Sequence, residues 1–463
     1  MIDHSSLSKR LTRLFAATAF ASTSTLFAAG QQLDLPPPSS DRDFPVHSDA
    51  QVNLGMLLFY DKILSGNMNM SCASCHHAVA ATGDGLSLPV GEGGRGIGIT
   101  RDTGKGKDAI HKRVPRNAPQ FFNQGAREFK ETFWDGRVEV CPNEPSGFCS
   151  PAGADLPKGL DNVLAVQAMF PVTSAEEMAG QPGENPVADA AAAGNLAGPG
   201  GVWAQLVQRV RNNPNYVKAF KEAYQCVDGP CDITMVQIAN AIAAYEARIG
   251  RADNSPFDRF LRGESGAMSA QQKAGMRLFY GKAGCADCHS GTFQTDHQYH
   301  SICFPQIGPG KGDRLPGGTD SFGDLGRERV TGDPADRLKF RTPQLRNVAW
   351  TGPWNHSGSH NGLEAVVRHH LDPAASLEDY DPNQAVLPSR PDLDRIDVVH
   401  HYDAGNRAAM FATLDPLLEN PVKLRDWEIA RLIDFLHALT DPASLDLRDT
   451  VPAMVPSGLP LYD

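Results

Sequence analysis

One phrase occurs twice in this chain, and that repeat constrains the fold more than any other feature of the sequence. Residues 55–76 read GMLLFYDKILSGNMNMSCASCH, and residues 275–289 read GMRLFYGKAGCADCH. Both copies run from Gly-Met through Leu-Phe-Tyr and a lysine into Cys-x-x-Cys-His, and the gap is shorter in the second copy. Such internal similarity indicates two related domains of similar plan.

Cys-x-x-Cys-His is the attachment sequence of c-type haem. The two thiols form thioethers with the haem vinyl groups, and the adjacent histidine becomes the proximal ligand of the iron. A zinc site would need four ligands in a closed set, and a thioredoxin-like dithiol would need a βαβ setting that the sequence does not show. We therefore expect two covalently bound haem c groups, the first held by Cys72, Cys75 and His76 and the second by Cys285, Cys288 and His289.

Helical periodicity dominates the rest of the chain. Apolar residues recur at spacings of three and four in residues 203–210, 233–249 and 427–439, which is typical of amphipathic helices. No run of alternating strand residues is present. We expect an all-α fold with two cytochrome c-like haem domains, the N-terminal one over residues 45–250 and the C-terminal one over residues 255–445.

Long connectors rich in Gly and Pro separate these helices, at residues 89–108, 141–160, 179–201 and 304–334. Because Gly and Pro break helices and strands, these stretches predict long irregular loops. Residues 91–96 read GEGGRG and fit the Gly-x-Gly-x-x-Gly pattern of dinucleotide-binding sites. They follow no predicted strand and open no predicted helix, so we interpret them as a plain glycine-rich loop.

Residues 1–30 have the pattern of a secretory signal peptide. A basic start with Lys9, Arg10 and Arg13 leads into an apolar stretch that ends in small residues, as signal peptides do. The alternative is an uncleaved anchor, but the apolar run is short and rich in Ser and Thr. No other stretch approaches ~20 apolar residues, so we expect no stable membrane insertion. The predicted location is the periplasm, which is an oxidising compartment.

The charge balance bears on the partners. The 463 residues include 43 Lys and Arg against 54 Asp and Glu, which gives a formal net charge of −11. Binding along nucleic acid phosphates needs an excess of basic residues on one face. The composition therefore argues against nucleic acid as a partner.

Five of the nine cysteines lie outside the two haem motifs. Two pairs, Cys141 with Cys149 and Cys226 with Cys231, are close enough in sequence for short-loop disulfides, and Cys303 is left over. The sequence alone does not fix the connectivity.

Ordered motifs along the chain resemble those of one known family. They are FWDGR at residues 133–137, Gln167-Ala168 followed by Pro171, the dipeptide Glu177-Met178, and RTPQLRNVAWTGPWNHSGS at residues 341–359. Together with the two haem motifs, this order is similar to that of the bacterial dihaem cytochrome c peroxidase and MauG superfamily. The resemblance covers almost the whole chain after residue 30.

The resemblance implies that the N-terminal haem binds peroxide, in a distal pocket formed by Gln167, Pro171 and Glu177. A distal carboxylate can move a proton from the proximal to the distal oxygen of peroxide, and we assign that acid–base role to Glu177. Trp134 resembles the tryptophan that lies between the two haems and passes electrons or holes across the gap.

The same resemblance implies one calcium ion between the haems. Asn117 and the segment from Thr351 to Pro353 match the side chain and the carbonyl groups that hold this ion in the family. Oxygen donors of this kind suit calcium.

The first departure from the family pattern concerns the peroxidatic haem. Classical members carry a second histidine, sixteen residues after the motif histidine, that caps the iron until the other haem is reduced. Here that position is Glu92, and His77 and His111 are the remaining candidates for a cap. We expect a five-coordinate first haem that reacts with peroxide without prior reduction, as in MauG.

The second departure concerns the distal ligand of the C-terminal haem, which is normally Met in the peroxidases and Tyr in MauG. The corresponding count from His356 reaches His370, and His369 is the neighbour that could serve instead. A bis-histidine iron would have a lower potential than a His/Met centre.

These features favour a periplasmic dihaem c-type peroxidase that reduces hydrogen peroxide with electrons from a small cytochrome c or a cupredoxin. One alternative is a MauG-like oxidase that uses peroxide and high-valent irons to oxidise a protein substrate, and the two departures favour it. A second alternative is a non-catalytic dihaem electron-transfer protein, but such a protein would need no distal acid. The sequence is compatible with a homodimer.

Overall fold

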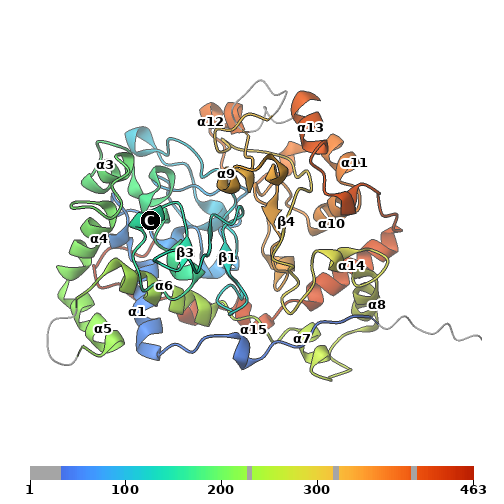
Figure 1. Ribbon diagram of the computed structural model, residues 1–463, viewed down its shortest axis with the longest axis horizontal. Coiled ribbons are helices and arrows are strands. Elements are labelled where there is room, and N and C mark those ends of the chain that lie inside the picture. The colour runs from blue at the N-terminus through green and yellow to red at the C-terminus, as the bar shows by residue number, and fades with distance from the viewer. Residues whose placement is uncertain (1–32, 227–231, 316–322, 398–403, 463) are drawn as a thin grey trace, which may run out of the picture. The chain divides into compact units, whose positions relative to one another are not determined.

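The structure is a computed structural model that describes residues 33–226, 232–315, 323–397 and 404–462. The predicted signal peptide over residues 1–30 lies outside the described residues. All elements named below belong to the unit that runs from residue 35 onwards. They are mostly helices joined by long irregular segments, as the sequence predicts (Figure 1).

Figure 1 follows the helices in chain order from blue to red. Those before residue 255 are α1 (Asp49–Tyr60), α2 (Val163–Gln167), α3 (Pro186–Ala192), α4 (Val202–Arg211), α5 (Pro214–Tyr224) and α6 (Met235–Ile249). Those after it are α7 (Pro256–Leu261), α8 (Ala270–Phe279), α9 (Glu328–Thr331), α10 (Leu363–Leu371), α11 (Pro373–Glu378), α12 (Pro391–Asp397), α13 (Ala404–Phe411), α14 (Asp426–Ala438) and α15 (Pro442–Leu445). The three helices predicted from periodicity are confirmed as α4, α6 and α14.

The repeated phrase forms one helix of each half, α1 and α8. Helix α1 packs against α6, and α8 packs against α14. A Cβ atom added to Gly55 would lie 1.8 Å from the carbonyl oxygen of Ala241 in α6. A Cβ atom added to Gly275 would lie 1.7 Å from the carbonyl oxygen of Arg431 in α14. Because only glycine allows two backbones to approach so closely, the repeated Gly-Met step marks the same helix crossing in both halves.

The apolar faces of α1, α2, α4, α5 and α6 build the hydrophobic core of the N-terminal half. A capping box fixes the start of α6, where the Thr234 hydroxyl accepts from the Gln237 N–H at 3.2 Å and the Gln237 side chain accepts from the Thr234 N–H at 3.1 Å. Ser269 caps α8 in the same way. These caps satisfy N–H groups that a helix start leaves without an intrahelical partner, and they fix which face of each helix meets the core.

The structure also contains short strands, so the all-α prediction was incomplete. The strands β1 (Glu131–Thr132), β2 (Val138–Val140) and β3 (Phe148–Cys149) form an antiparallel sheet in the order β1–β2–β3, with Thr132 opposite Val138. The strands β4 (Tyr299–His300) and β5 (Phe340–Arg341) pair antiparallel, with Tyr299 opposite Arg341. Strands of two or three residues are too short to show a period of two, which is why the sequence pattern did not predict them.

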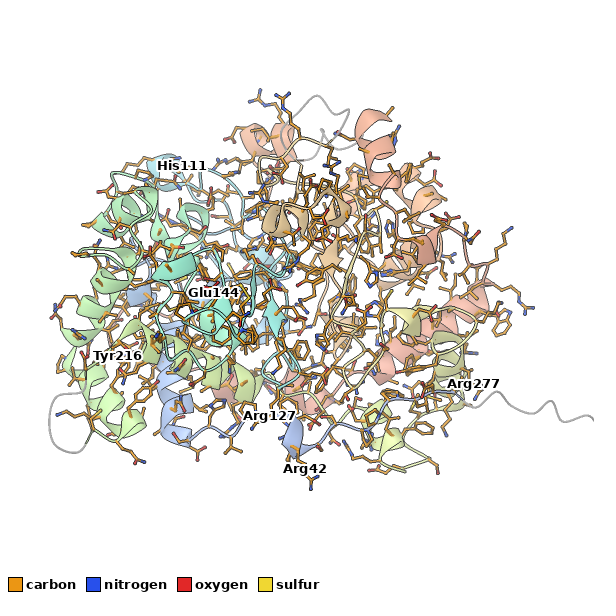
Figure 2. All side chains as sticks on the ribbon, in the orientation of Figure 1. Arg42, His111, Arg127, Glu144, Tyr216 and Arg277 are labelled. Carbon is orange, nitrogen blue, oxygen red and sulfur yellow. A yellow bond between two sulfur atoms is a disulfide. The ribbon has the colours of Figure 1, made fainter. Side chains whose placement is uncertain are left out.

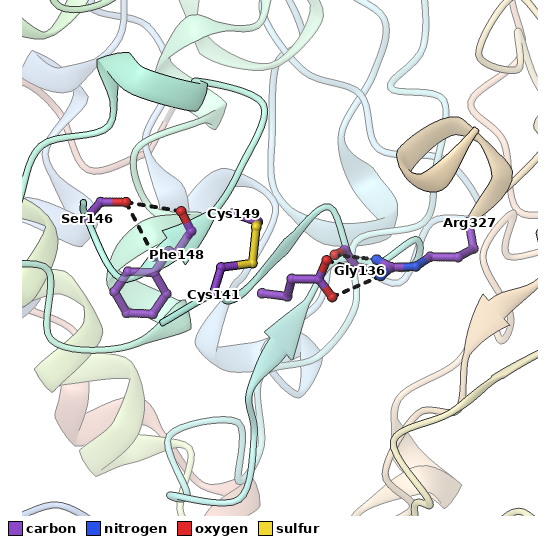
Figure 3. The surroundings of a disulfide bond; sticks show 7 residues. Gly136, Cys141, Ser146, Phe148, Cys149 and Arg327 are labelled. Atoms are coloured by element: carbon purple, nitrogen blue, oxygen red, sulfur yellow. Dashed lines mark hydrogen bonds and ion pairs between the residues drawn. A yellow bond between two sulfur atoms is a disulfide. The ribbon is translucent and has the colours of Figure 1, made fainter. Parts of the chain in front are cut away.

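A disulfide closes the loop between β2 and β3 (Figure 3). Cys141 and Cys149 are bonded, with their Cα atoms 5.4 Å apart, as their spacing in sequence suggested. Arg327, just before α9, ties this hairpin to the C-terminal half: it donates to the Glu139 carboxylate at 2.9 Å and to the Gly136 carbonyl oxygen at 2.8 Å.

Of the other cysteines outside the motifs, the structure describes Cys303 and Cys226 but not Cys231. Cys303 is a buried free thiol whose Sγ lies 3.2 Å from the carbonyl oxygen of Met410. The predicted pair of Cys226 with Cys231 reaches beyond the described residues, because Cys231 lies outside them.

Both ends of the described chain cross between the halves. Near the start, Phe44 packs against Phe293, with ring centres 5.9 Å apart. After α15 the chain returns to the N-terminal half, where Val455 joins the core and the Ser457 hydroxyl donates to the Asp61 carboxylate at 2.6 Å. Within the described residues, no helix is both long and apolar enough to cross a bilayer.

Candidate functional site

The first Cys-x-x-Cys-His motif lines a cavity of about 130 Å³ in the N-terminal half. Cys72 begins a single 3-10 turn, and His76 follows with its Nδ1 atom 2.9 Å from the carbonyl oxygen of Thr82. That hydrogen bond fixes the proton on Nδ1 and leaves the lone pair on Nε2. Burial lowers the pKa of His76, so the ring is neutral. A neutral imidazole with a free Nε2 is what a haem iron requires of its proximal ligand.

The motif cysteines are buried thiols rather than activated nucleophiles. Burial raises the pKa of Cys72 and that of Cys285 to about 12. Redox-active dithiols show the opposite shift, because their chemistry requires a thiolate. The electrostatics therefore argue against a thioredoxin-like dithiol and fit thiols that are consumed in thioether bonds.

The three predicted distal residues line the same cavity as the first motif. Gln167 ends α2, Pro171 begins a 3-10 turn (Pro171–Thr173), and Glu177 lies in a π-helical turn (Ala175–Ala179). Such π turns are rare and occur often at functional sites. The structure thus brings the residues that the sequence spacing selected to one cavity.

Two contacts hold the π turn in place. The Ser174 hydroxyl caps it by accepting from the Glu177 N–H at 3.3 Å. Behind it lies the glycine-rich loop, where a Cβ atom added to Gly91 would lie 1.8 Å from the carbonyl oxygen of Glu176 and the Glu92 N–H donates to that oxygen at 3.0 Å. The loop that resembles a dinucleotide motif therefore supports the turn that carries Glu177.

The electrostatic surroundings of Glu177 suit proton transfer. Burial raises the pKa of its carboxyl group, and the positive charges of Arg137 and Lys311 oppose that effect in part. A carboxyl group whose pKa is moved towards neutrality can both take up and return a proton at working pH.

No candidate cap reaches this cavity. The Glu92 carboxylate accepts hydrogen bonds from the side chains of Asn67 at 2.9 Å and Asn69 at 2.6 Å, away from the cavity lining. His111 is exposed at the periphery of the molecule (Figure 2). His77 is buried, but its Nδ1 accepts from the Val79 N–H at 3.1 Å. His76 is the only histidine among the described residues that line the cavity.

The second motif lines a cavity of about 230 Å³, together with His370 of α10. His289 Nδ1 lies 3.1 Å from the carbonyl oxygen of Gln294, and His370 Nδ1 lies 2.8 Å from that of Val366. Both rings therefore present Nε2 lone pairs, and their centres are 6.1 Å apart. Two imidazoles on opposite sides of one metal, with metal–nitrogen bonds of about 2 Å, have ring centres roughly 6 Å apart.

His369 is placed differently from its neighbour. Its Nδ1 lies 3.0 Å from the Ser376 hydroxyl, and its Nε2 lies 2.7 Å from the carbonyl oxygen of Ile302. With both ring nitrogens engaged, the ring has no lone pair directed at the cavity, and it stacks on Phe304 instead. The geometry favours His370 as the ligand that the sequence left open between the two.

Trp134 lies between the two cavities and lines both. Its indole N–H donates to the carbonyl oxygen of Asn117 at 3.0 Å, and its own carbonyl oxygen accepts from the Arg341 N–H at 2.8 Å. An indole fixed in this position is suited to a relay, because its aromatic ring belongs to the walls of both cavities.

The predicted calcium ligands also lie together. Asn117, Thr351 and Pro353 all line the second cavity. The Asn117 amide N–H₂ donates to the carbonyl oxygen of Leu86 at 2.9 Å, which orients the amide group and leaves its oxygen as the acceptor. These oxygen donors match the chemistry of calcium.

A charged cluster beside the first cavity was missed by the sequence analysis. Arg116 pairs with Asp324 at 2.6 Å and with Asp135 at 2.6 Å, and all three side chains are buried. Arg137 and Lys311 complete the cluster and line the cavity with Arg116. Asp324 and Lys311 come from the C-terminal half, so no local motif could have linked them to this site.

Buried Glu246 of α6 was also missed. It lines the first cavity, and burial raises its pKa to about 8. A helix pattern predicts an apolar inner face and gives no reason to expect a carboxyl group there.

Comparison with known proteins agrees with this arrangement. A sequence profile described as di-haem cytochrome c peroxidase matches residues 49–266. The cytochrome-c peroxidase IdrP1 of Pseudomonas sp. (strain SCT) is 30% identical over 369 residues, which cover 76% of this chain and 79% of that protein. The methylamine utilization protein MauG of Methylorubrum extorquens is 28% identical over 324 residues, 69% of this chain and 68% of that protein.

Among solved structures, a MauG-like protein associated with microbial copper homeostasis is similar over 90% of this chain and 96% of that one, with a TM-score of 0.57 and 26% identity. The fold and the two motif-lined cavities thus define a dihaem c-type cytochrome. The chain belongs to the di-haem cytochrome c peroxidase and MauG family. It is an oxidoreductase of the peroxide-reducing cytochrome c peroxidase type, and membership implies two haem groups.

Proposed function

We propose that this protein is a periplasmic dihaem peroxidase that reduces hydrogen peroxide at the N-terminal haem with electrons from a small cytochrome c or a cupredoxin. The observation that carries the proposal is the shared cavity of the first motif, with His76 on its wall together with Gln167, Pro171 and Glu177. The N-terminal haem domain spans residues 45–250 and the C-terminal one residues 255–445.

Cys72, Cys75 and His76 would hold the peroxidatic haem, and Cys285, Cys288, His289 and His370 would hold the second. When bound, the haem groups supply the two electrons that peroxide reduction requires, which an external donor replaces. Glu177 takes a proton from peroxide and returns it to the leaving oxygen, so that this oxygen departs as water. Gln167 and Pro171 orient peroxide and restrict water around that carboxyl group. Trp134 passes electrons between the two sites.

A calcium ion held by Asn117, Thr351 and Pro353 would stiffen the segment between the cavities. The carbonyl oxygen of Asn117 binds the Trp134 indole, so an ion at this place would also fix the relay. Removal of calcium with a chelator should slow electron passage to the first site without changing the residues that meet peroxide.

The MauG-like oxidase is the second candidate, and a specific observation favours it. Among the described residues of the first cavity there is no histidine that could act as a cap, and His370 replaces the Met ligand of the classical peroxidases. In that case the protein would use peroxide to oxidise residues of another protein. A non-catalytic electron carrier is disfavoured, because it has no use for a buried carboxyl group at the distal position.

The Glu177→Gln variant tests the proposal. Turnover of peroxide with reduced cytochrome c should fall by about 10²- to 10⁴-fold, since general acid–base catalysis contributes that much. Glu176→Gln is the matched control, because Glu176 is the preceding residue of the same turn and does not line the cavity. Equal rates for Glu177→Gln and wild type would refute the assignment. Wild-type protein that oxidises a protein substrate but consumes reduced cytochrome c only slowly would support the MauG-like oxidase hypothesis.

A further inference from the structure

Lys311 is a cation in the wall of the first cavity that comes from the other half of the chain. It lies in the connector after the second haem motif, yet it lines the same cavity as Gln167 and Glu177. The peroxide site proposed above is therefore built from both halves of the chain.

The backbone of Lys311 is held on both sides. Its N–H donates to the carbonyl oxygen of Gly323 at 2.9 Å, and its carbonyl oxygen accepts from Arg329 of α9 at 3.2 Å. Asp313 pairs with Gly323 in an isolated antiparallel bridge. These contacts fix the place from which the Lys311 side chain reaches the cavity.

The other two cations of the cavity wall already form ion pairs with carboxylates. The Arg116 guanidinium is bound to Asp324 and Asp135. Arg137 pairs with Asp135 at 3.1 Å and lies over the Phe133 ring, 3.6 Å from its centre. In the described part of the chain, no acceptor lies within hydrogen-bonding or ion-pair distance of the Lys311 ammonium. Lys311 is thus the cation of this wall whose N–H groups remain to bind something in the cavity.

The surroundings of Lys311 bring the pKa of its ammonium group closer to neutral pH. Burial lowers its pKa to about 8, and the positive charges of Arg116 and Arg137 act in the same direction. Asp324 and Glu177 oppose that shift, and Glu177 is itself influenced by Lys311. The two groups therefore act on each other across the cavity.

We propose that Lys311 is a second catalytic residue of the peroxide pocket, whose ammonium group binds the oxygen that becomes negative when Glu177 removes a proton. In the first step the Glu177 carboxylate takes one proton from hydrogen peroxide, which gives a carboxylic acid and the hydroperoxide anion. The O–O bond then breaks with two electrons that the haem groups would supply, and the same proton returns to the leaving hydroxide, which departs as water. The remaining oxygen takes up two protons from solvent and becomes a second water, so that hydrogen peroxide, two electrons and two protons give two waters. Lys311 keeps its proton throughout and stabilises the anion by a charge-assisted hydrogen bond.

The proposal rests on the proposed function, but its test does not require turnover. Fluoride is a small anion that binds ferric haem, and its affinity is measured from absorption spectra of the diferric holoprotein. The Lys311→Met variant should bind fluoride about 10- to 100-fold more weakly, because a hydrogen bond to a charged group contributes that much. Lys311→Arg should retain most of the affinity, since it keeps the cation.

The pH profile adds a readout that a purely structural lysine would not change. Fluoride affinity of the wild type should fall as the pH rises through about 8, where Lys311 loses its proton, and Lys311→Met should lack that step. Lys218→Met is the matched control, because Lys218 is 80% exposed on α5.

Normal haem spectra in Lys311→Met together with unchanged fluoride affinity would overturn the proposal. If Lys311→Met fails to incorporate haem, the comparison of Lys311→Gln with Lys311→Arg decides, and equal affinities in those two variants would overturn it as well. Fluoride binding that depends on Lys311 in a protein without peroxide turnover would contradict the peroxidase function alone. It would leave the role of Lys311 in anion binding in place.

Discussion

The Gly275→Ala substitution tests whether the glycine of the repeated phrase is required for the close packing of α8 against α14. The added Cβ would lie 1.7 Å from the carbonyl oxygen of Arg431 and 2.8 Å from the Cβ of Phe435. Helices α8 and α14 must separate to remove these overlaps, which costs about 3 kcal/mol of packing and strain. Alanine recovers about 1 kcal/mol through its higher helix propensity. We expect the free energy of unfolding to fall by about 2 kcal/mol as the net of these two contributions.

The assay is urea denaturation of the holoprotein followed by circular dichroism. Gly266→Ala is the matched control, because no atom lies within 4 Å of a Cβ at that position, and its stability should equal or slightly exceed that of the wild type. Gly55→Ala should repeat the loss in the N-terminal half, where the overlap is with Ala241. A Gly275→Ala protein as stable as the Gly266→Ala protein would refute the reasoning.

Two further predictions concern histidines. His370→Ala should convert one of the two haems from low spin to high spin in the electron paramagnetic resonance spectrum, whereas His369→Gln should leave that signal in place; the reverse pattern would show that His369 is the ligand. His297 bonds to Glu128 and Glu131, each at 3.1 Å, and these partners raise its pKa to about 9. Because the unfolded value is about 6.5, its stabilisation is fully present below that pH and is lost as the pH rises through 9. His297→Gln should therefore remove about 2 kcal/mol of stability at pH 6 and little at pH 10, as measured by urea denaturation at the two pH values, and an equal loss at both would contradict the ion pairs.

The sequence predicted those parts of the site that depend on short spacings. The first Cys-x-x-Cys-His motif lines one cavity with Gln167, Pro171 and Glu177, and the second motif lines the other cavity. The periodicity of α4, α6 and α14 was strong enough to locate all three helices. These features are local, so one stretch of sequence contains their whole signal.

The remaining features depend on contacts between distant segments. Asp324 pairs with Arg116, and Lys311 lines the same cavity as Glu177, only because the two halves pack together, and no spacing rule predicts that. The choice between His369 and His370 depends on their directions around α10, which differ by about 100° between successive helical residues. The sequence showed two adjacent histidines, and only the backbone decides which one faces the cavity.

The most direct test of the proposed function is the reaction of the fully oxidised, diferric holoprotein with hydrogen peroxide, followed by stopped-flow absorption. No described histidine besides His76 lines the first cavity, so we expect a rapid spectral change on mixing, with no need to reduce the second haem beforehand. The change should be much slower in Glu177→Gln. A diferric protein that stays inert to peroxide until one haem has been reduced would contradict an open distal site at the first haem.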